Sequence, residues 1–202
     1  MRSWLPDPIG TIMWFGVDDT TYSVHTPIYC SLSRVPSKWA NGFGDALTFE
    51  WSAFWTFNVV ANMVYGDNRI GGEVRKEVEM KEREFQMATD RLDKIALDLW
   101  KDGAHKEAIE LLSEFSLNTA DELVEYWKAL WMRLFVRYRD GFVVSMPTPP
   151  VPDHNGDMGG LVPNVEEVGY PIFWYDTIVN ITGDKYLVLD QSQQVSRTSK
   201  GL

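Results

Sequence analysis

The sequence is poor in three features that often define a class of protein: cysteine, clustered positive charge and long apolar runs. Cys30 is the only cysteine among 202 residues, so no internal disulfide can form. Asp and Glu number 29 against 19 Lys and Arg, and the resulting net charge of −10 argues against nucleic-acid and anionic-membrane partners. No run approaches the roughly 20 apolar residues of a membrane-spanning helix, and residues 1–6 lack the plan of a signal peptide. If Met1 is the true start, the chain is expected to be soluble and cytoplasmic.

Metal-ligand clusters and cofactor motifs are also missing. The three histidines, His25, His105 and His154, are far apart, and none has the spacing of a metal site. Cys30 lies in the apolar sequence PIYCSL with no basic residue closer than Arg34, so we expect a packed, protonated thiol and not a nucleophile. The sequence therefore predicts no metal, no cofactor and no catalytic cysteine in this chain.

Apolar residues, in contrast, are abundant. They make up 45% of the chain and include nine tryptophans, which predicts a buried core. Strand-like runs at residues 12–17 and 22–29 flank a turn at residues 18–21, and a third run covers residues 31–35. Pro27 interrupts the second run, which favours an edge or a bulge over a central strand.

Four helices are predicted after residue 50. Their approximate ranges are 51–65, from the Gly71-Gly72 pair to 100, 104–115, and from 119 to a stop at Asp140-Gly141. The first is apolar on nearly all sides and is expected to lie deep in the protein. The second has apolar residues at heptad spacing, which predicts one buried stripe. The fourth is predicted to begin at a capping box, Thr119 with Glu122. Its apolar face comprises Leu123, Trp127, Leu130, Leu134 and Tyr138.

These elements predict an α+β fold in a single domain. Residues 1–146 are expected to supply its strands and helical layers. Residues 147–163 are rich in Pro and Gly and predict a loop. Residues 164–202 are expected to form an apolar segment and a frayed tail of the same domain.

Five polar residues are candidates for binding a small substrate. Asp18 and Asp19 could bind an α-amino group, although aspartates also favour turns by accepting hydrogen bonds from their own backbone. Asn58 and Asn62 share one helical face, where buried amides either pair with neighbouring backbone or anchor a substrate or an oxyanion. Arg2 could hold a substrate carboxylate through its planar guanidinium group, or lie solvated near the chain end.

Several segments occur in an order that resembles a known family: RSWLPDPIG, TPIYC with the following SRVP, SAFWTFNVVAN, RYRDGFV and VGYP. Together, within residues 2–144 and 167–171, they resemble the second half of the cysteine dipeptidases of dipeptidase A type, in the N-terminal-nucleophile hydrolase superfamily. The resemblance implies part of a four-layer αββα sandwich with a large helical portion and few strands. It also implies hydrolysis of dipeptides or short peptides through a cysteine acyl-enzyme, in which the nucleophile is the first residue after a leader is removed and its α-amino group is the base.

The chain departs from that family at the nucleophile. Met1 and Arg2 stand at its start, and Cys30 matches no nucleophile of the family. We therefore expect the C-terminal portion of a dipeptidase, inactive without an N-terminal half that carries the cysteine. Exposed strand edges are expected to promote self-association, giving a possible homo-oligomer. The alternative is a non-catalytic binding or scaffold protein derived from the same fold, and the tryptophan content alone suggests a third reading, a saccharide binder.

Overall fold

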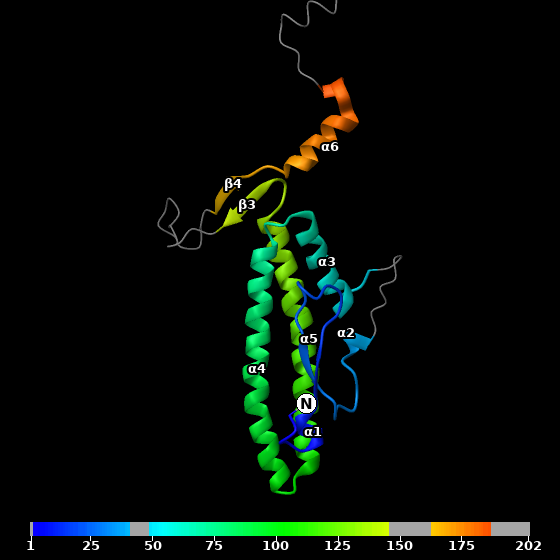
Figure 1. Ribbon diagram of the computed structural model, residues 1–202, viewed down its shortest axis with the longest axis vertical. Helices are drawn as coiled ribbons and strands as arrows, with labels where there is room; N and C mark the ends of the chain where they lie inside the picture. The colour runs from blue at the N-terminus through cyan, green and yellow to red at the C-terminus, as the bar shows by residue number, and fades with distance from the viewer. Residues whose placement is uncertain (1, 41–48, 146–162, 187–202) are drawn as a thin grey trace, which may run out of the picture. The chain divides into compact units, whose positions relative to one another are not determined.

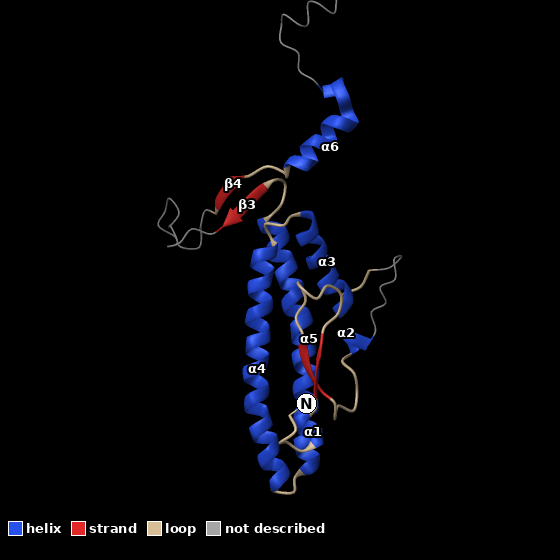
Figure 2. Cartoon of the chain, viewed as in Figure 1, coloured by secondary structure: helices blue, strands red, loops and turns tan. Residues whose placement is uncertain are grey.

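The computed structural model describes residues 2–40, 49–145 and 163–186. Its contacts divide the chain into two compact units, residues 1–138 and 139–202. Helices dominate the described residues, and the strands form two small antiparallel sheets of two strands each (Figure 2). The fold class is therefore α+β, as predicted.

Two long helices, α4 (Gly71–Lys101) and α5 (His105–Arg137), lie side by side in the first unit (Figure 1). At about 1.5 Å per residue, α5 is roughly 50 Å long. The chain reverses after α4 at Gly103, whose φ of 81° is easily adopted only by glycine. The N–H of Gly103 donates to Trp100 O (3.2 Å) and that of Ala104 donates to Leu99 O (2.9 Å). This pair of bonds is a Schellman motif, which satisfies carbonyls at the helix end.

The helix α5 is continuous across residues 116–118, so the predicted break and the capping box at Thr119 were wrong. Two serines before Thr119 turn their hydroxyls back onto the helix itself: Ser113 Oγ donates to Ile109 O (2.7 Å) and Ser116 Oγ to Leu112 O (2.8 Å). Residues that often cap a helix are tolerated here because the buried face continues through them. Tertiary packing thus overrides the local preference of Ser, Asn and Thr for helix ends.

The helix α3 (Ala53–Gly66) begins at Ser52, whose side chain accepts a hydrogen bond from the N–H of Trp55 (3.3 Å). It buries Phe57 and its neighbours on one side only. On the other side Asn62 is exposed, and Tyr65 is 66% exposed. The expectation that this helix lies deep in the protein was therefore wrong, since an apolar sequence leaves the direction of burial undetermined.

The main core of the first unit lies between α3, α4 and α5. Val24, from the N-terminal segment, is fully buried in it. The predicted apolar face of α5 is confirmed, because its first four members are buried and Tyr138 packs against them. The buried members of this core are Val24, Phe57, Val60, Val64, Ile70, Val74, Val78, Leu123, Trp127, Leu130 and Leu134.

The N-terminal segment forms a short helix, α1 (Asp7–Gly10), and a hairpin of β1 (Ile12–Phe15) and β2 (Thr26–Tyr29). The strands are antiparallel, with Ile12 opposite Tyr29 and Phe15 opposite Thr26. Strand β2 packs on α5. The hairpin and the turn at residues 18–21 confirm the prediction, with shorter strands.

The predicted third strand at residues 31–35 is absent, because the chain turns directly after β2. The N–H of Leu32 donates to Tyr29 O (3.1 Å), and Ser31 Oγ donates to Pro8 O (3.0 Å). A one-turn helix, α2 (Ser37–Ala40), follows.

The second unit contains β3 (Phe142–Ser145), β4 (Asn164–Glu167), α6 (Ile172–Thr182) and the 3₁₀ turn η2 (Gly183–Tyr186). The two strands pair antiparallel. Nearly all of the predicted Pro/Gly loop and the whole predicted tail at residues 191–202 lie outside the described residues. The assignment of residues 164–202 to the same domain as the first unit stays a prediction. Among the residues that the structure describes, no helix is long and apolar enough to cross a membrane.

Candidate functional site

The turn between β1 and β2 carries the first two candidate residues. Asp18 has a φ of 67°, a left-handed conformation that aspartate tolerates better than most residues. Asp19 accepts hydrogen bonds through Oδ1 from the N–H groups of Thr21 (2.7 Å) and Tyr22 (2.8 Å). Asp19 thus shapes the turn by accepting hydrogen bonds from the backbone that follows it, which is the usual role of an aspartate in a turn.

The second oxygen of Asp19 accepts a hydrogen bond from the hydroxyl of Tyr65 on α3. Burial alone would raise the pKa of Asp19. The hydrogen bonds from Tyr65 and from the Tyr22 and Thr21 backbone together outweigh burial, so the pKa of Asp19 lies below its ordinary value. The same contact raises the pKa of Tyr65, because the neutral hydroxyl is the form that donates to the carboxylate. Both oxygens of Asp19 are therefore engaged.

Asp18 is joined to α3 through a short chain of amides. Asn58 Nδ2 donates to Asp18 Oδ1 (2.9 Å). Asn62 Nδ2 in turn donates to Asn58 Oδ1 (3.0 Å) and Asn58 O (2.9 Å). The structure thus brings four of the five predicted residues together on one surface. It also corrects the expected burial, because Asn58 is only partly buried and Asn62 is exposed.

The chemistry of this cluster differs between its two carboxylates. Among the described residues, Asp18 Oδ2 has no hydrogen-bond partner, whereas Asp19 has none of its acceptor oxygens free. Asp18 is solvent-exposed, and Asn58 holds its other oxygen. A carboxylate oriented in this way is suited to accept hydrogen bonds from an ammonium group.

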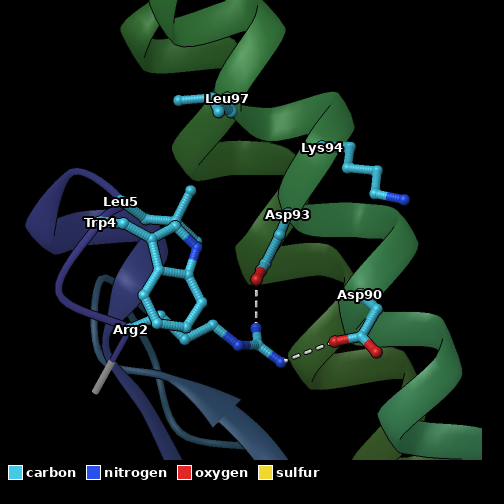
Figure 3. A pocket seen from close by; sticks show the side chains of 7 residues that line it. All are labelled: Arg2, Trp4, Leu5, Asp90, Asp93, Lys94 and Leu97. Atoms are coloured by element: carbon cyan, nitrogen blue, oxygen red, sulfur yellow. Dashed lines mark hydrogen bonds and ion pairs between the residues drawn. The ribbon is translucent and has the colours of Figure 1, made fainter.

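Arg2, the fifth candidate, lies elsewhere, against the C-terminal half of α4 (Figure 3). Its guanidinium group forms an ion pair with Asp93 and a second one with Asp90 (3.1 Å). Arg2 Nη2 also lies 3.3 Å from Thr89 Oγ1. With a side chain only 17% exposed, Arg2 is not a solvated charge near a chain end, and that expectation was wrong.

A depression of about 370 Å³ surrounds this contact. The indole of Trp4 lies beside the Arg2 guanidinium, and Leu97 adds to the apolar part of the wall (Figure 3). Since both terminal nitrogens of Arg2 already face carboxylates or a hydroxyl, the group is used mainly to hold the N-terminal segment on α4.

Sequence reasoning missed the partner of Arg2. Asp93 is 6% exposed, and it accepts a hydrogen bond from the hydroxyl of the fully buried Tyr29 (2.5 Å). Burial first, and then the hydrogen bond and the charge of Asp93, raise the pKa of Tyr29. An acidic residue next to Leu92 on the buried stripe of α4 was the signal available in the sequence, because a buried carboxylate needs a partner.

A second contact between the hairpin and α4 was also missed. His25 Nδ1 lies 2.8 Å from Glu82 Oε1, and the same oxygen accepts the backbone N–H of His25 (3.2 Å). Both side chains are about two-fifths exposed, at 40% and 39%. This contact links the residue that precedes β2 to α4.

Cys30 is exposed, so the expectation of a packed cysteine was wrong. It follows β2 directly, where the chain turns away from the core, and only its backbone bonds to the hairpin (Cys30 N to Thr11 O, 2.9 Å). Among the described residues, no three His, Cys, Asp or Glu side chains lie close enough together to hold a metal ion.

Comparison with known protein families gives a match to the N-terminal part of the chain. Residues 1–81 match the model of peptidase family C69. This confirms the predicted resemblance to the dipeptidase A type peptidases over these residues. The matched range includes the hairpin, α3 and the Asp18 cluster, which comprises Asp18, Asp19, Asn58 and Asn62. The RYRDGFV and VGYP segments lie beyond the match. No curated protein and no solved structure matches the chain.

Proposed function

We propose that this chain is the C-terminal portion of a cysteine dipeptidase and is inactive alone, because the nucleophile belongs to a separate segment. The observation that carries this proposal is the match of residues 1–81 to a peptidase family. The only cysteine within the match is Cys30, which stands at a turn after a strand, with no side-chain partner among the described residues. In an αββα sandwich, the hairpin would contribute to one sheet and the long helices to an outer layer.

The reaction would follow acyl transfer. A thiolate from the companion segment attacks the peptide carbonyl, the C–N bond breaks as the amine leaves, and water then hydrolyses the thioester. Hydrogen-bond donors would hold the oxyanion. This chain would contribute binding and orientation of the substrate.

Asp18 is the residue proposed to bind the α-ammonium group of the peptide. Its support is the free Oδ2 atom, the exposed position and the amide of Asn58 that holds Oδ1. Asp19 would act indirectly, since its carboxylate shapes the turn that presents Asp18. Arg2 is left with a structural role, because Asp93 and Asp90 already occupy its guanidinium group.

The activity test uses the purified chain and a panel of dipeptides, with and without the nucleophile-bearing portion of a family C69 dipeptidase. We expect no hydrolysis by the chain alone and hydrolysis by the mixture. Turnover by the isolated chain would contradict the proposal. If that turnover were then lost in the Cys30→Ser variant, Cys30 would be identified as the nucleophile. A mixture that binds dipeptides without hydrolysing them would favour the non-catalytic alternative.

The binding test is independent of catalysis. Titration of a dipeptide into the chain, followed by NMR shifts, should show contact at the Asp18 cluster, and an N-acetylated dipeptide should bind far more weakly. Asp18→Asn should weaken binding roughly tenfold, because an ionised acceptor is lost. Asp7→Asn, at another exposed aspartate, is the matched control and should have no effect. Equal binding by the two variants would refute the role of Asp18.

A further inference from the structure

The two strands of the N-terminal hairpin differ sharply in exposure. Strand β2 is mostly buried, whereas Met13, Trp14 and Phe15 of β1 are 48%, 37% and 38% exposed. A sheet of two strands is marginal in water unless it packs on other elements. Here β2 packs on α5, and β1 forms the outer strand.

The register shows which backbone groups of β1 point outward. Cys30 N–H donates to Thr11 O (2.9 Å), so these two residues form a hydrogen-bonded pair. Hydrogen-bonded and non-hydrogen-bonded pairs alternate along an antiparallel ladder. The pairs Ile12 with Tyr29 and Trp14 with Pro27 are therefore non-hydrogen-bonded. The N–H and C=O groups of Ile12 and Trp14 point away from β2.

The corresponding outward positions of β2 offer no free N–H group. The N–H of His25 donates to Glu82 Oε1 on α4 (3.2 Å). The N–H of Tyr29 donates to Ser116 Oγ on α5 (3.1 Å). Between them Pro27 has no N–H to offer. No donor on this edge is left for another strand.

The outer edge of β1 is open by the same criterion. Within the part of the chain that the structure describes, the N–H groups of Ile12 and Trp14 have no partner. The strand sequence IMWF also contains no charge and no proline. Charges and prolines are two of the devices that keep exposed edges from pairing with other strands, so this short edge is available to another strand.

Charge selects the kind of strand. No Lys or Arg occurs between residues 3 and 33, whereas Asp7, Asp18 and Asp19 lie on either side of β1. A second copy would bring the same acidic residues and a net charge of −10 to the edge. A segment with basic ends is complementary in charge. Because side chains are exposed on both faces of β1, the centre of that segment should be apolar on both faces.

We propose that the open edge of β1 binds an extended segment of another polypeptide, apolar at its centre and basic at its ends, by strand addition. The binding of a strand at this edge does not depend on the proposed function. Only the identification of its natural occupant with the nucleophile-bearing segment rests on that function. Failure of the two can be distinguished, because the test below measures no activity.

The probe is a synthetic peptide with a Val-Ile-Val-Ile centre and two lysines at each end. Amide hydrogen exchange of the full chain, followed by NMR, should show that the peptide protects the amides of Ile12 and Trp14 and leaves that of Tyr29 unchanged. An analogue N-methylated at its four central residues should give no protection. An analogue with glutamates in place of the lysines should bind about tenfold more weakly at low ionic strength.

Protein variants give the second arm. Trp14→Pro removes one outward N–H without touching the ladder to β2, and it should lower affinity for the lysine peptide about tenfold. Trp14→Val keeps the N–H and is the matched control for loss of the indole. Far-UV circular dichroism checks folding, and if the proline variant does not fold, the N-methylated peptide decides.

Three results would overturn the proposal. The first is protection of Ile12 and Trp14 by the N-methylated peptide. The second is equal affinity of Trp14→Pro and Trp14→Val. The third is a dimer of the chain alone in which both amides are already protected, since a second copy would then be the occupant.

Discussion

Replacing Arg2 by methionine should destabilise the chain by about 3 kcal/mol. The side chain of Asp93 is only 9% exposed and loses its ion pair in this variant. Removing one partner of a buried pair costs about 3–5 kcal/mol, because it leaves an uncompensated charge. We expect the lower end of that range, because Arg2 is 17% exposed and Tyr29 still donates to Asp93.

A double variant separates this charge effect from lost packing. Adding Asp93→Asn to Arg2→Met removes the buried negative charge and leaves an acceptor for the Tyr29 hydroxyl. The double variant should therefore recover roughly half of the lost stability, about 1.5 kcal/mol. Arg69→Met is the matched control. Its pair with Asp67 is more exposed, with side chains 38% and 18% exposed, so it should cost less than about 1 kcal/mol.

Urea unfolding followed by circular dichroism at the helical band measures these differences, since α4 and α5 supply most of the signal. Comparison at equal m-values keeps the free energies of unfolding comparable. The reasoning is refuted if Arg2→Met stays within 1 kcal/mol of the parent. It is equally refuted if the double variant is less stable than Arg2→Met alone.

Three further predictions concern a helix cap, a titrating carboxylate and the core. Ser52→Ala should cost about 1 kcal/mol in urea unfolding, because the N–H of Trp55 loses its acceptor at the start of α3; no change would mean that the cap contributes nothing. Asp19 has a lowered pKa in the folded state, so it stabilises the fold above its unfolded pKa of about 3.9, and this contribution is lost as pH falls through the folded pKa. The difference in unfolding midpoint between Asp19→Asn and the parent should therefore be full at pH 7 and shrink below about pH 4, whereas a constant difference would exclude the contact with Tyr65 as its origin. Trp127→Ala should cost about 4 kcal/mol, because the side chain is fully buried between the helices, and a loss below 2 kcal/mol would contradict its central place in the core.

Local patterns predicted the elements whose causes are local. The hairpin follows from two apolar runs around an Asp-rich turn, and Asp19 binds the backbone as aspartates in turns do. The extent of α4 and the buried face of α5 follow from their apolar spacing. The four-residue spacing of Asn58 and Asn62 likewise placed their side chains together.

The incorrect predictions share a different cause, which is packing between segments distant in sequence. Nothing near Thr119 signals that the buried face of α5 continues through it. The exposure of Asn62 depends on which side of α3 meets the other helices. The ion pair of Arg2 with Asp93 joins residues 91 positions apart, so neither residue could be assigned its role from its neighbours.

The same long-range packing ties the residues that match the peptidase family to residues outside the match. The family match ends at residue 81, inside α4. Yet α3, which positions Asn58 and Asn62, is held by a core that includes Leu123 and Trp127 of α5, beyond the match. At the inner edge of the hairpin, the N–H of Tyr29 likewise donates to Ser116 of α5. The residues that match the peptidase family therefore depend on the long helix that follows them, and the candidate site belongs to the first unit as a whole.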